Sequence, residues 1–146
     1  MAEHSIEEPS SIVTDRELAL IKCLYRFPAS QHILCRWHVN MNVLTKTKKW
    51  FPAPVRVDGV IQRHPQFQEF IQSWNTLLDS CTEHMYNQEL VKFKAKYPTA
   101  AVTYCVDTWL LWKENLVACY INQCFHFGIT VTSLIEGCHA TMKAFL

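Results

Sequence analysis

Two carboxylates, Asp15 and Glu136, have the residue type and the placement for divalent-metal chemistry. Asp15 follows the β-branched run Ser11–Thr14, and Glu136 lies near the start of an amphipathic segment. If both reach the carboxyl edge of a small parallel sheet, their oxygens can bind Mg²⁺ or Mn²⁺ for phosphodiester cleavage by two metals about 3.5–4 Å apart. The residues alone favour a simpler interpretation, in which Asp15 caps a helix and Glu136 interacts with a helix dipole.

Cysteine and histidine form a second candidate site. Cys35 and His38 have the Cys-x-x-His spacing of half a zinc site, and Cys138 with His139 can supply the other half, three residues from Glu136. The alternative is that Cys35 is a small buried hydrophobic residue and that His38 hydrogen-bonds a nearby backbone group. The sequence leaves both interpretations open.

Five basic residues are candidates for contacts with DNA phosphates: Arg16, Arg36, Lys46, Lys48 and Lys49. The two arginines are the better placed because each lies beside a proposed site residue. For the lysines, a solvated helix face is the simpler use.

Further candidates lie in the aromatic-rich middle of the chain. Trp74, Trp109 or Trp112 could stack on an unpaired base, although most such residues belong to a core. The lysines at 92, 94 and 96 could likewise contact phosphates, and a solvated helix face is again the simpler use.

The elements that must position these residues follow from the hydrophobic pattern. Residues 11–50 predict a strand, a helix, a second strand over Gln31–Cys35 parallel to the first, and a second helix from Arg36 that ends before Pro52. Residues 51–127 predict a helical insertion, with three or four helices and boundaries near Pro65 and Pro98. Residues 128–146 predict a last helix that carries Glu136, and residues 1–10 predict a flexible leader.

Composition limits the class of protein. The chain has 146 residues, is 49% hydrophobic and contains three glycines, which is enough for one packed domain. Seven scattered cysteines, an odd number, indicate a reducing intracellular compartment and free thiols or a metal site. No apolar run is long enough for a membrane span, and the net charge of +1 gives no global attraction to nucleic acid.

Two stretches resemble the Mutator-like (MULE) transposase family. They are SIVTDRELALIKCLYRFPASQHILCRWHVNMNV and, much later, FGITVTSLIEGCHATMKAFL. The matching features are a strand ending in Thr-Asp-Arg-Glu, a Phe-Pro step, a Leu-Cys-x-Trp-His strand exit and a Thr-Ser-x-x-Glu-x-x-His helix after a helical insert. Their order and spacing cover the chain from about Pro9 to Leu146.

The resemblance implies an α/β, mostly helical fold: a partial ribonuclease H-like core with short parallel strands and an all-helical insertion. It matches Asp15 to the second catalytic carboxylate and Glu136 to the third, with Mg²⁺ or Mn²⁺ as cofactor and transposon ends as DNA partner. It also matches Cys35, His38 and His139 to the family's cysteine and histidine positions, where zinc is a hypothesis. The family's first aspartate is expected upstream of Pro9.

We therefore expect a truncated DDE-type transposase domain that does not catalyse alone, in the nucleus or the cytoplasm. Its expected protein partner is a second copy or the missing N-terminal half of a transposase, and no membrane is expected. The alternatives are a domesticated DNA-binding or transcriptional regulatory module, like the plant far-red-impaired regulators that resemble these transposases, or an inert remnant.

Overall fold

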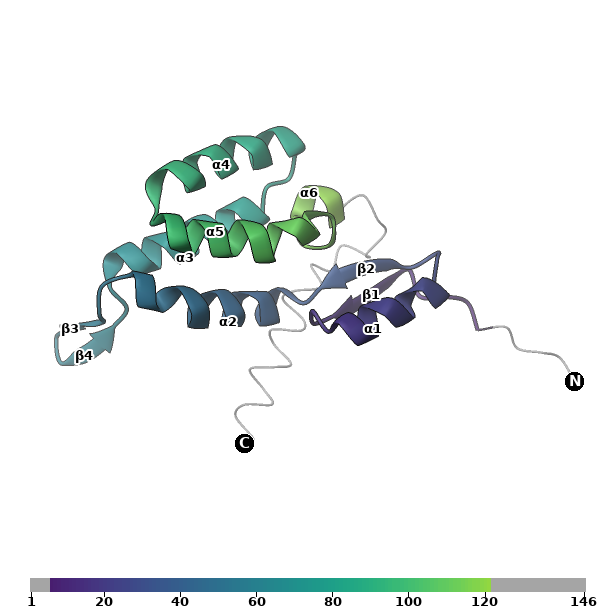
Figure 1. Ribbon diagram of the computed structural model, residues 1–146, viewed down its shortest axis with the longest axis horizontal. Coiled ribbons are helices and arrows are strands. Elements are labelled where there is room, and N and C mark those ends of the chain that lie inside the picture. The colour runs from purple at the N-terminus through teal and green to yellow at the C-terminus, as the bar shows by residue number, and fades with distance from the viewer. Residues whose placement is uncertain (1–5, 122–146) are drawn as a thin grey trace, which may run out of the picture.

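The computed structural model describes residues 6–121, in which a small parallel sheet adjoins a larger helical layer (Figure 1). Strand β1 (Ser11–Thr14) pairs in parallel with β2 (Gln31–Leu34), and Thr14 lies opposite Leu34. The amide of Cys35 extends the ladder by donating to the carbonyl of Thr14 at 2.7 Å. The expected parallel pair is therefore confirmed, together with an α/β class that is mostly helical.

The connection between the two strands is less helical than the sequence predicts. Helix α1 covers Leu18–Cys23 and continues as a short 3-10 helix, η1, over Leu24–Arg26. Glu17 is in an extended conformation, with φ −88° and ψ 112°, so the helix begins only after it. The interpretation in which Asp15 caps this helix is therefore wrong, because Glu17 is the N-cap residue.

The last three residues of the expected leader, 8–10, are hydrogen-bonded to the folded part of the chain. Pro9 and Ser10 accept hydrogen bonds through their carbonyl oxygens from Ser30 and Gln31, and the Glu8 carboxylate accepts one from the amide of Ala29 at 3.0 Å. Residues 8–10 therefore lie against the turn that precedes β2.

The second helix leads away from the sheet. Helix α2 (Arg36–Thr47) is followed by the 3-10 helix η2 (Lys48–Trp50), and both end before Pro52, as expected. The buried residues Val39 and Val43 of α2 face the helical layer.

A β-hairpin follows, and it corrects the expectation of an all-helical insertion over 51–127. Strands β3 (Val55–Val57) and β4 (Val60–Gln62) are antiparallel and are joined by Asp58 and Gly59 alone. Both turn residues have positive φ, 49° and 80°, as in a type I′ turn, for which Asp-Gly is a preferred pair. The hairpin projects from the end of the molecule opposite the sheet (Figure 1).

The remaining described elements form the helical layer. They are α3 (Pro65–Leu78), α4 (Glu83–Lys96), α5 (Thr99–Thr108), the 3-10 helix η3 (Leu110–Asn115) and α6 (Ala118–Ile121). The expected boundaries near Pro65 and Pro98 are confirmed, because Pro65 is the first residue of α3 and Pro98 is the N-cap of α5.

Aromatic side chains dominate the core of this layer. Phe70 stacks on Phe93 with ring centroids 5.4 Å apart, and Trp74 packs beside Phe93 at 6.0 Å. Leu34 and Val43 join the same core from β2 and α2, so the layer is packed against the elements that follow the sheet. None of the helices within residues 6–121 combines the length and the apolar character needed to cross a bilayer.

Candidate active site

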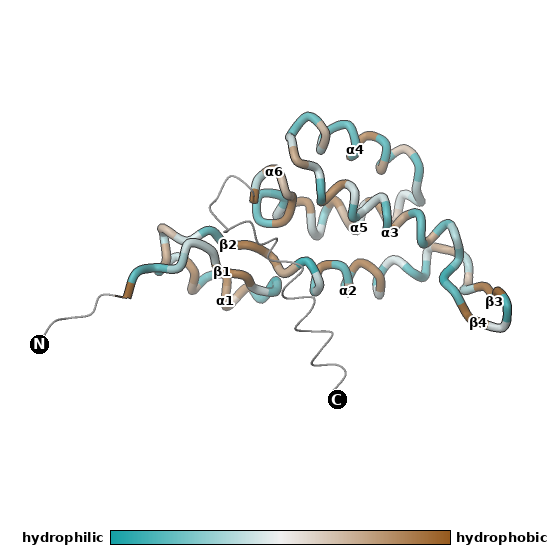
Figure 2. Tube along the Cα trace, turned by 180° about the vertical axis from the view of Figure 1, so that it is seen from behind, coloured by the Kyte–Doolittle hydropathy of each residue, from teal (hydrophilic) through white to brown (hydrophobic). Residues whose placement is uncertain are grey.

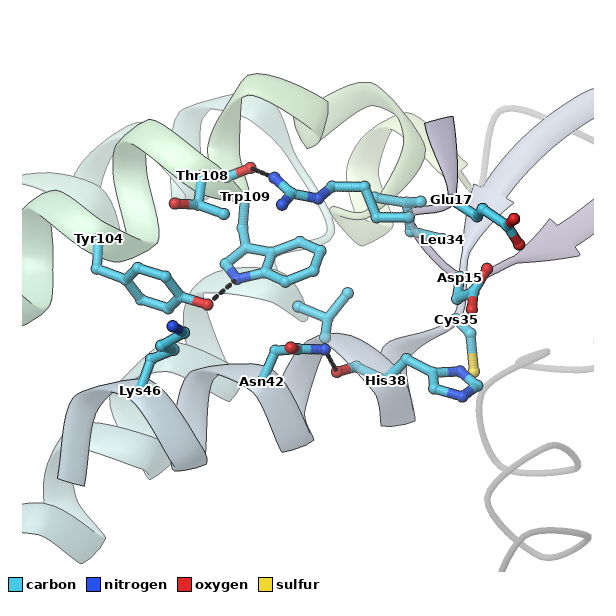
Figure 3. A pocket seen from close by; sticks show the side chains of 12 residues that line it. Asp15, Glu17, Leu34, Cys35, His38, Asn42, Lys46, Tyr104, Thr108 and Trp109 are labelled. Carbon is cyan, nitrogen blue, oxygen red and sulfur yellow. Dashed lines mark hydrogen bonds between the residues drawn. The ribbon is translucent and has the colours of Figure 1, made fainter. Parts of the chain in front are cut away.

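A cleft of about 530 Å³ lies where the carboxyl ends of β1 and β2 meet α2 and the end of α5 (Figure 3). Its lining includes two carboxylates, two basic side chains and the Cys-x-x-His pair. These are Asp15, Glu17, Arg16, Lys46, Cys35 and His38. The fold therefore brings most of the site residues expected in the first 50 residues to one surface.

Asp15 lies immediately after β1 and is exposed to solvent in the cleft. Its carboxylate has no hydrogen bond or ion pair with any other described residue. The capping role that the sequence alone favours is therefore not seen, and the carboxylate is available to a ligand.

Glu17 is a second carboxylate on the same cleft, and the sequence reasoning gave it no role. Its position could have been found, since it lies two residues beyond Asp15 and precedes the helix. Figure 3 shows both carboxylates at the end of the cleft that Cys35 and His38 also line.

Cys35 and His38 are positioned by the junction between β2 and α2. Cys35 is 4% exposed and is the N-cap residue of α2, with an extended backbone. His38 is half-buried one turn later, and its carbonyl accepts a hydrogen bond from the Asn42 side chain at 2.8 Å. The two side chains share the cleft with Asp15, so the pair stands beside the candidate catalytic carboxylate rather than at a separate place.

His32 connects β2 to β1 through a side-chain contact with Thr14, the residue before Asp15. Its Nε2 lies 2.6 Å from Oγ1 of Thr14, and its carbonyl accepts a hydrogen bond from the Asn115 side chain at 2.8 Å. Burial lowers the pKa of His32 below its ordinary value of 6.5, because desolvation disfavours the charged imidazolium. His32 therefore links β2 to β1, at the residue before Asp15, and to η3.

Arg16 reaches from the loop after β1 to the end of α5. Its guanidinium carbon lies 4.8 Å from the centroid of the Trp109 ring, and its Nη1 donates to the carbonyl of Thr108 at 3.2 Å. The Trp109 indole in turn donates to the Tyr104 hydroxyl at 3.3 Å. Trp109 is 3% exposed, so the expected base-stacking role is corrected to one of packing and support.

Arg36 has a structural role, and its expected contact with DNA is corrected. Its guanidinium donates to the Asn75 side chain at 2.8 Å, to the Asn75 carbonyl at 3.1 Å and to the Asp79 carboxylate at 3.1 Å. These contacts join the start of α2 to the end of α3 and leave Arg36 buried. Trp74 is also fully buried, which removes it as a base-stacking candidate.

The expected lysines are exposed at the far end of α2. Lys46 lines the cleft, whereas Lys48 and Lys49 lie beyond it in η2. The ammonium of Lys49 lies 4.7 Å from the centroid of the Trp50 ring. In Figure 3, Lys46 stands at the opposite end of the cleft from Asp15.

The donor set suits a hard divalent cation in part. Mg²⁺ accepts one or two carboxylates and completes its octahedral shell with water and substrate phosphates, and the Asp15 and Glu17 carboxylates are donors of this kind. However, the His, Cys, Asp and Glu side chains of residues 6–121 nowhere form a group of three that could hold a metal ion. Glu136, Cys138 and His139, the remaining expected ligands, lie outside the described residues.

Comparisons with known proteins leave the family open. No family model matches the chain, and no solved structure matches it. The chain is similar to a PKS-NRPS hybrid synthetase of Chaetomium globosum, with 24% identity over 157 aligned residues. This match covers 97% of the chain and 3% of the length of the curated relative. At this identity and share of length, the match shows neither the family nor the activity of this chain.

Proposed function

We propose that the chain is part of a DDE-type transposase catalytic domain of the Mutator-like kind, which binds a divalent cation through Asp15 and does not cut DNA alone. The observation that supports it is the convergence of Asp15, Cys35 and His38 on one cleft at the carboxyl end of a parallel strand pair. Carboxyl ends of parallel strands are where ligands bind in open α/β sheets. The proposal includes a partial ribonuclease H-like core, of which β1 and β2 are the described strands.

In this proposal Asp15 supplies a metal ligand and Glu136 a second one. A divalent ion bound there would polarise a phosphodiester oxygen and activate water. Arg16, held against Trp109 and Thr108, fixes the loop that carries Asp15. Lys46 contributes positive charge at the other end of the cleft, where a phosphate backbone would be attracted. Zinc bound by Cys35, His38, Cys138 and His139 remains a separate part of the proposal.

Divalent-ion binding tests the proposal. We expect calorimetric titration with Mn²⁺ to show weaker binding in Asp15→Asn and in Glu136→Ala than in the wild-type chain. Asp58→Asn is the matched control, because it removes the same charge from the distant hairpin turn, where Asn accepts a positive φ. Equal Mn²⁺ affinity in all four proteins would refute a shared metal site.

A DNA-binding regulatory module without catalysis is the second candidate. It is favoured by the lack of a three-ligand group within the described part of the chain together with the exposed lysines at the end of α2. Sequence-selective DNA binding that is unchanged by a chelator would favour this candidate. Metal-dependent nicking, after the chain is combined with a segment that carries the family's first catalytic aspartate, would favour the transposase.

A further inference from the structure

The β3–β4 hairpin is largely exposed to solvent. Of its six strand residues, only Val55 is half-buried and the other five are exposed. Ile61 is 68% exposed and Val60 59%, and Figure 2 shows these hydrophobic strands at the projecting end of the molecule. A two-stranded hairpin without a covering layer is marginally stable in water, so this one is suited to gain order on a partner.

Positive charge is concentrated around the hairpin. Residues 46–63 contain five basic side chains, Lys46, Lys48, Lys49, Arg56 and Arg63, and one acidic side chain, Asp58. This segment therefore has a net charge of +4, whereas the whole chain has +1. None of these five cations forms an ion pair with another residue in the described part of the chain. The charge is thus available to an anionic partner.

A hollow of about 280 Å³ lies at the base of the hairpin. Lys48, Arg63 and His64 line it together with Pro52, Pro54 and Phe67. Phe67 stacks on Phe51 with ring centroids 5.1 Å apart, so one wall of the hollow is fixed by the core. Lys48 in η2 lines this hollow and Lys46 in α2 lines the cleft, so the junction of α2 and η2 connects the two surfaces.

We infer that the β3–β4 hairpin, the end of α2 and η2 form a basic arm, residues 46–64, that binds double-stranded DNA. Arg56 and Arg63 would contact phosphates, while the hairpin enters the major groove. The inference rests on the proposed function for the choice of DNA over other polyanions. The geometry favours B-form DNA over duplex RNA, because the major groove of B-DNA admits a two-stranded β-ribbon and that of A-form RNA is too narrow and deep.

The position of the arm agrees with the cleft. Helix α2 has 12 residues and is therefore about 18 Å long, at 1.5 Å per residue, and it lies between the sheet, where Asp15 follows β1, and the hairpin (Figure 1). That length corresponds to about five base-pair steps at 3.4 Å each. A duplex held by the arm and lying along α2 would bring a phosphodiester about half a helical turn away to Asp15.

Fluorescence anisotropy with a labelled duplex of arbitrary sequence tests the arm in the full chain. We expect Arg56→Gln with Arg63→Gln to weaken binding and to lower the slope of log K against log salt by about 2, since each lost phosphate contact removes about 0.9. The charge-matched control is Lys22→Gln with Arg26→Gln, at exposed residues on the sheet side of the molecule. Control binding and slope should equal those of the wild type, and Arg56→Lys with Arg63→Lys should keep most of the binding.

Three results would overturn the inference. These are an equal loss in the arm and control variants, no loss in the arm variant, and binding of duplex RNA as tight as that of DNA. Mn²⁺ titration of Asp15→Asn without DNA separates this inference from the proposed function, because it tests the metal site and leaves the arm untouched. If Asp15 has no role in Mn²⁺ binding while the arm variant still binds DNA more weakly, the proposed function fails and the inference about the arm stands. If Mn²⁺ binding depends on Asp15 and the arm variant binds DNA as tightly as the wild type, only the inference about the arm fails.

Discussion

Arg16 and Trp109 lie 93 positions apart in the chain, yet the guanidinium carbon of one is 4.8 Å from the ring centroid of the other. The same guanidinium donates to the carbonyl of Thr108 at 3.2 Å. This contact attaches the loop that carries Asp15 to the end of α5. The cleft therefore has one wall from the sheet region and another from the helical layer, and Arg16 connects them.

Removing the Arg16 cation tests this connection. We expect Arg16→Met to lower the free energy of unfolding by about 0.5–1 kcal/mol, the size of a cation–π contact at an exposed site. Arg26→Met is the control, because Arg26 stacks only on its neighbour Tyr25, at 6.0 Å. Urea unfolding followed by circular dichroism measures both variants, and equal losses would contradict a specific role for Arg16.

Cys35 gives a prediction about burial and zinc. Cys35→Ser places a hydroxyl at a position that is 4% exposed, so we expect a loss of about 1–3 kcal/mol in unfolding free energy. Cys23→Ser is the matched control, because Cys23 is exposed. If zinc is bound, a chelator should also lower the melting temperature of the wild type and leave that of Cys35→Ser unchanged. An unaltered melting temperature in Cys35→Ser would refute both roles.

The ion pair between Arg36 and Asp79 predicts unequal losses of stability when one or the other partner is replaced. Arg36→Met should cost about 1.5–3 kcal/mol of stability, because buried charge-assisted hydrogen bonds to Asn75 are lost. Asp79→Asn should cost about 0–1 kcal/mol, since the Asp79 side chain is 70% exposed and its ion pair is screened by solvent. Urea unfolding at pH 7 measures both, and a larger loss in Asp79→Asn would reverse this assignment.

His32 predicts a dependence of stability on pH. Burial lowers the pKa of His32 in the folded chain below 6.5, so the unfolded chain binds the proton first as the pH falls. The contribution to stability is complete above pH 6.5 and is lost progressively as the pH falls from there through the lower folded pKa. Thermal unfolding of the wild type and His32→Gln between pH 8 and 5 checks the sign. The stability difference between the two proteins should shrink or reverse on acidification, and a difference that grows would contradict it.

The sequence by itself determined the local elements of this protein. The β-branched run before Asp15, the apolar QHIL stretch and the prolines at 52, 65 and 98 predicted strands and boundaries that the structure confirms. The β3–β4 hairpin was equally readable, because Asp58 and Gly59 lie between two valine-containing runs. Such features depend on backbone preferences within a few residues, so the sequence states them directly.

Only the tertiary structure decided what the individual side chains do. Arg16 and Arg36 are the same residue type, each beside a proposed site residue, yet one lines the cleft and the other is buried against α3. Trp109 looked like a base-stacking candidate until its partner proved to be Arg16. The physical reason is that burial and charge pairing depend on which distant segments return to the same place, and local sequence patterns do not encode that return.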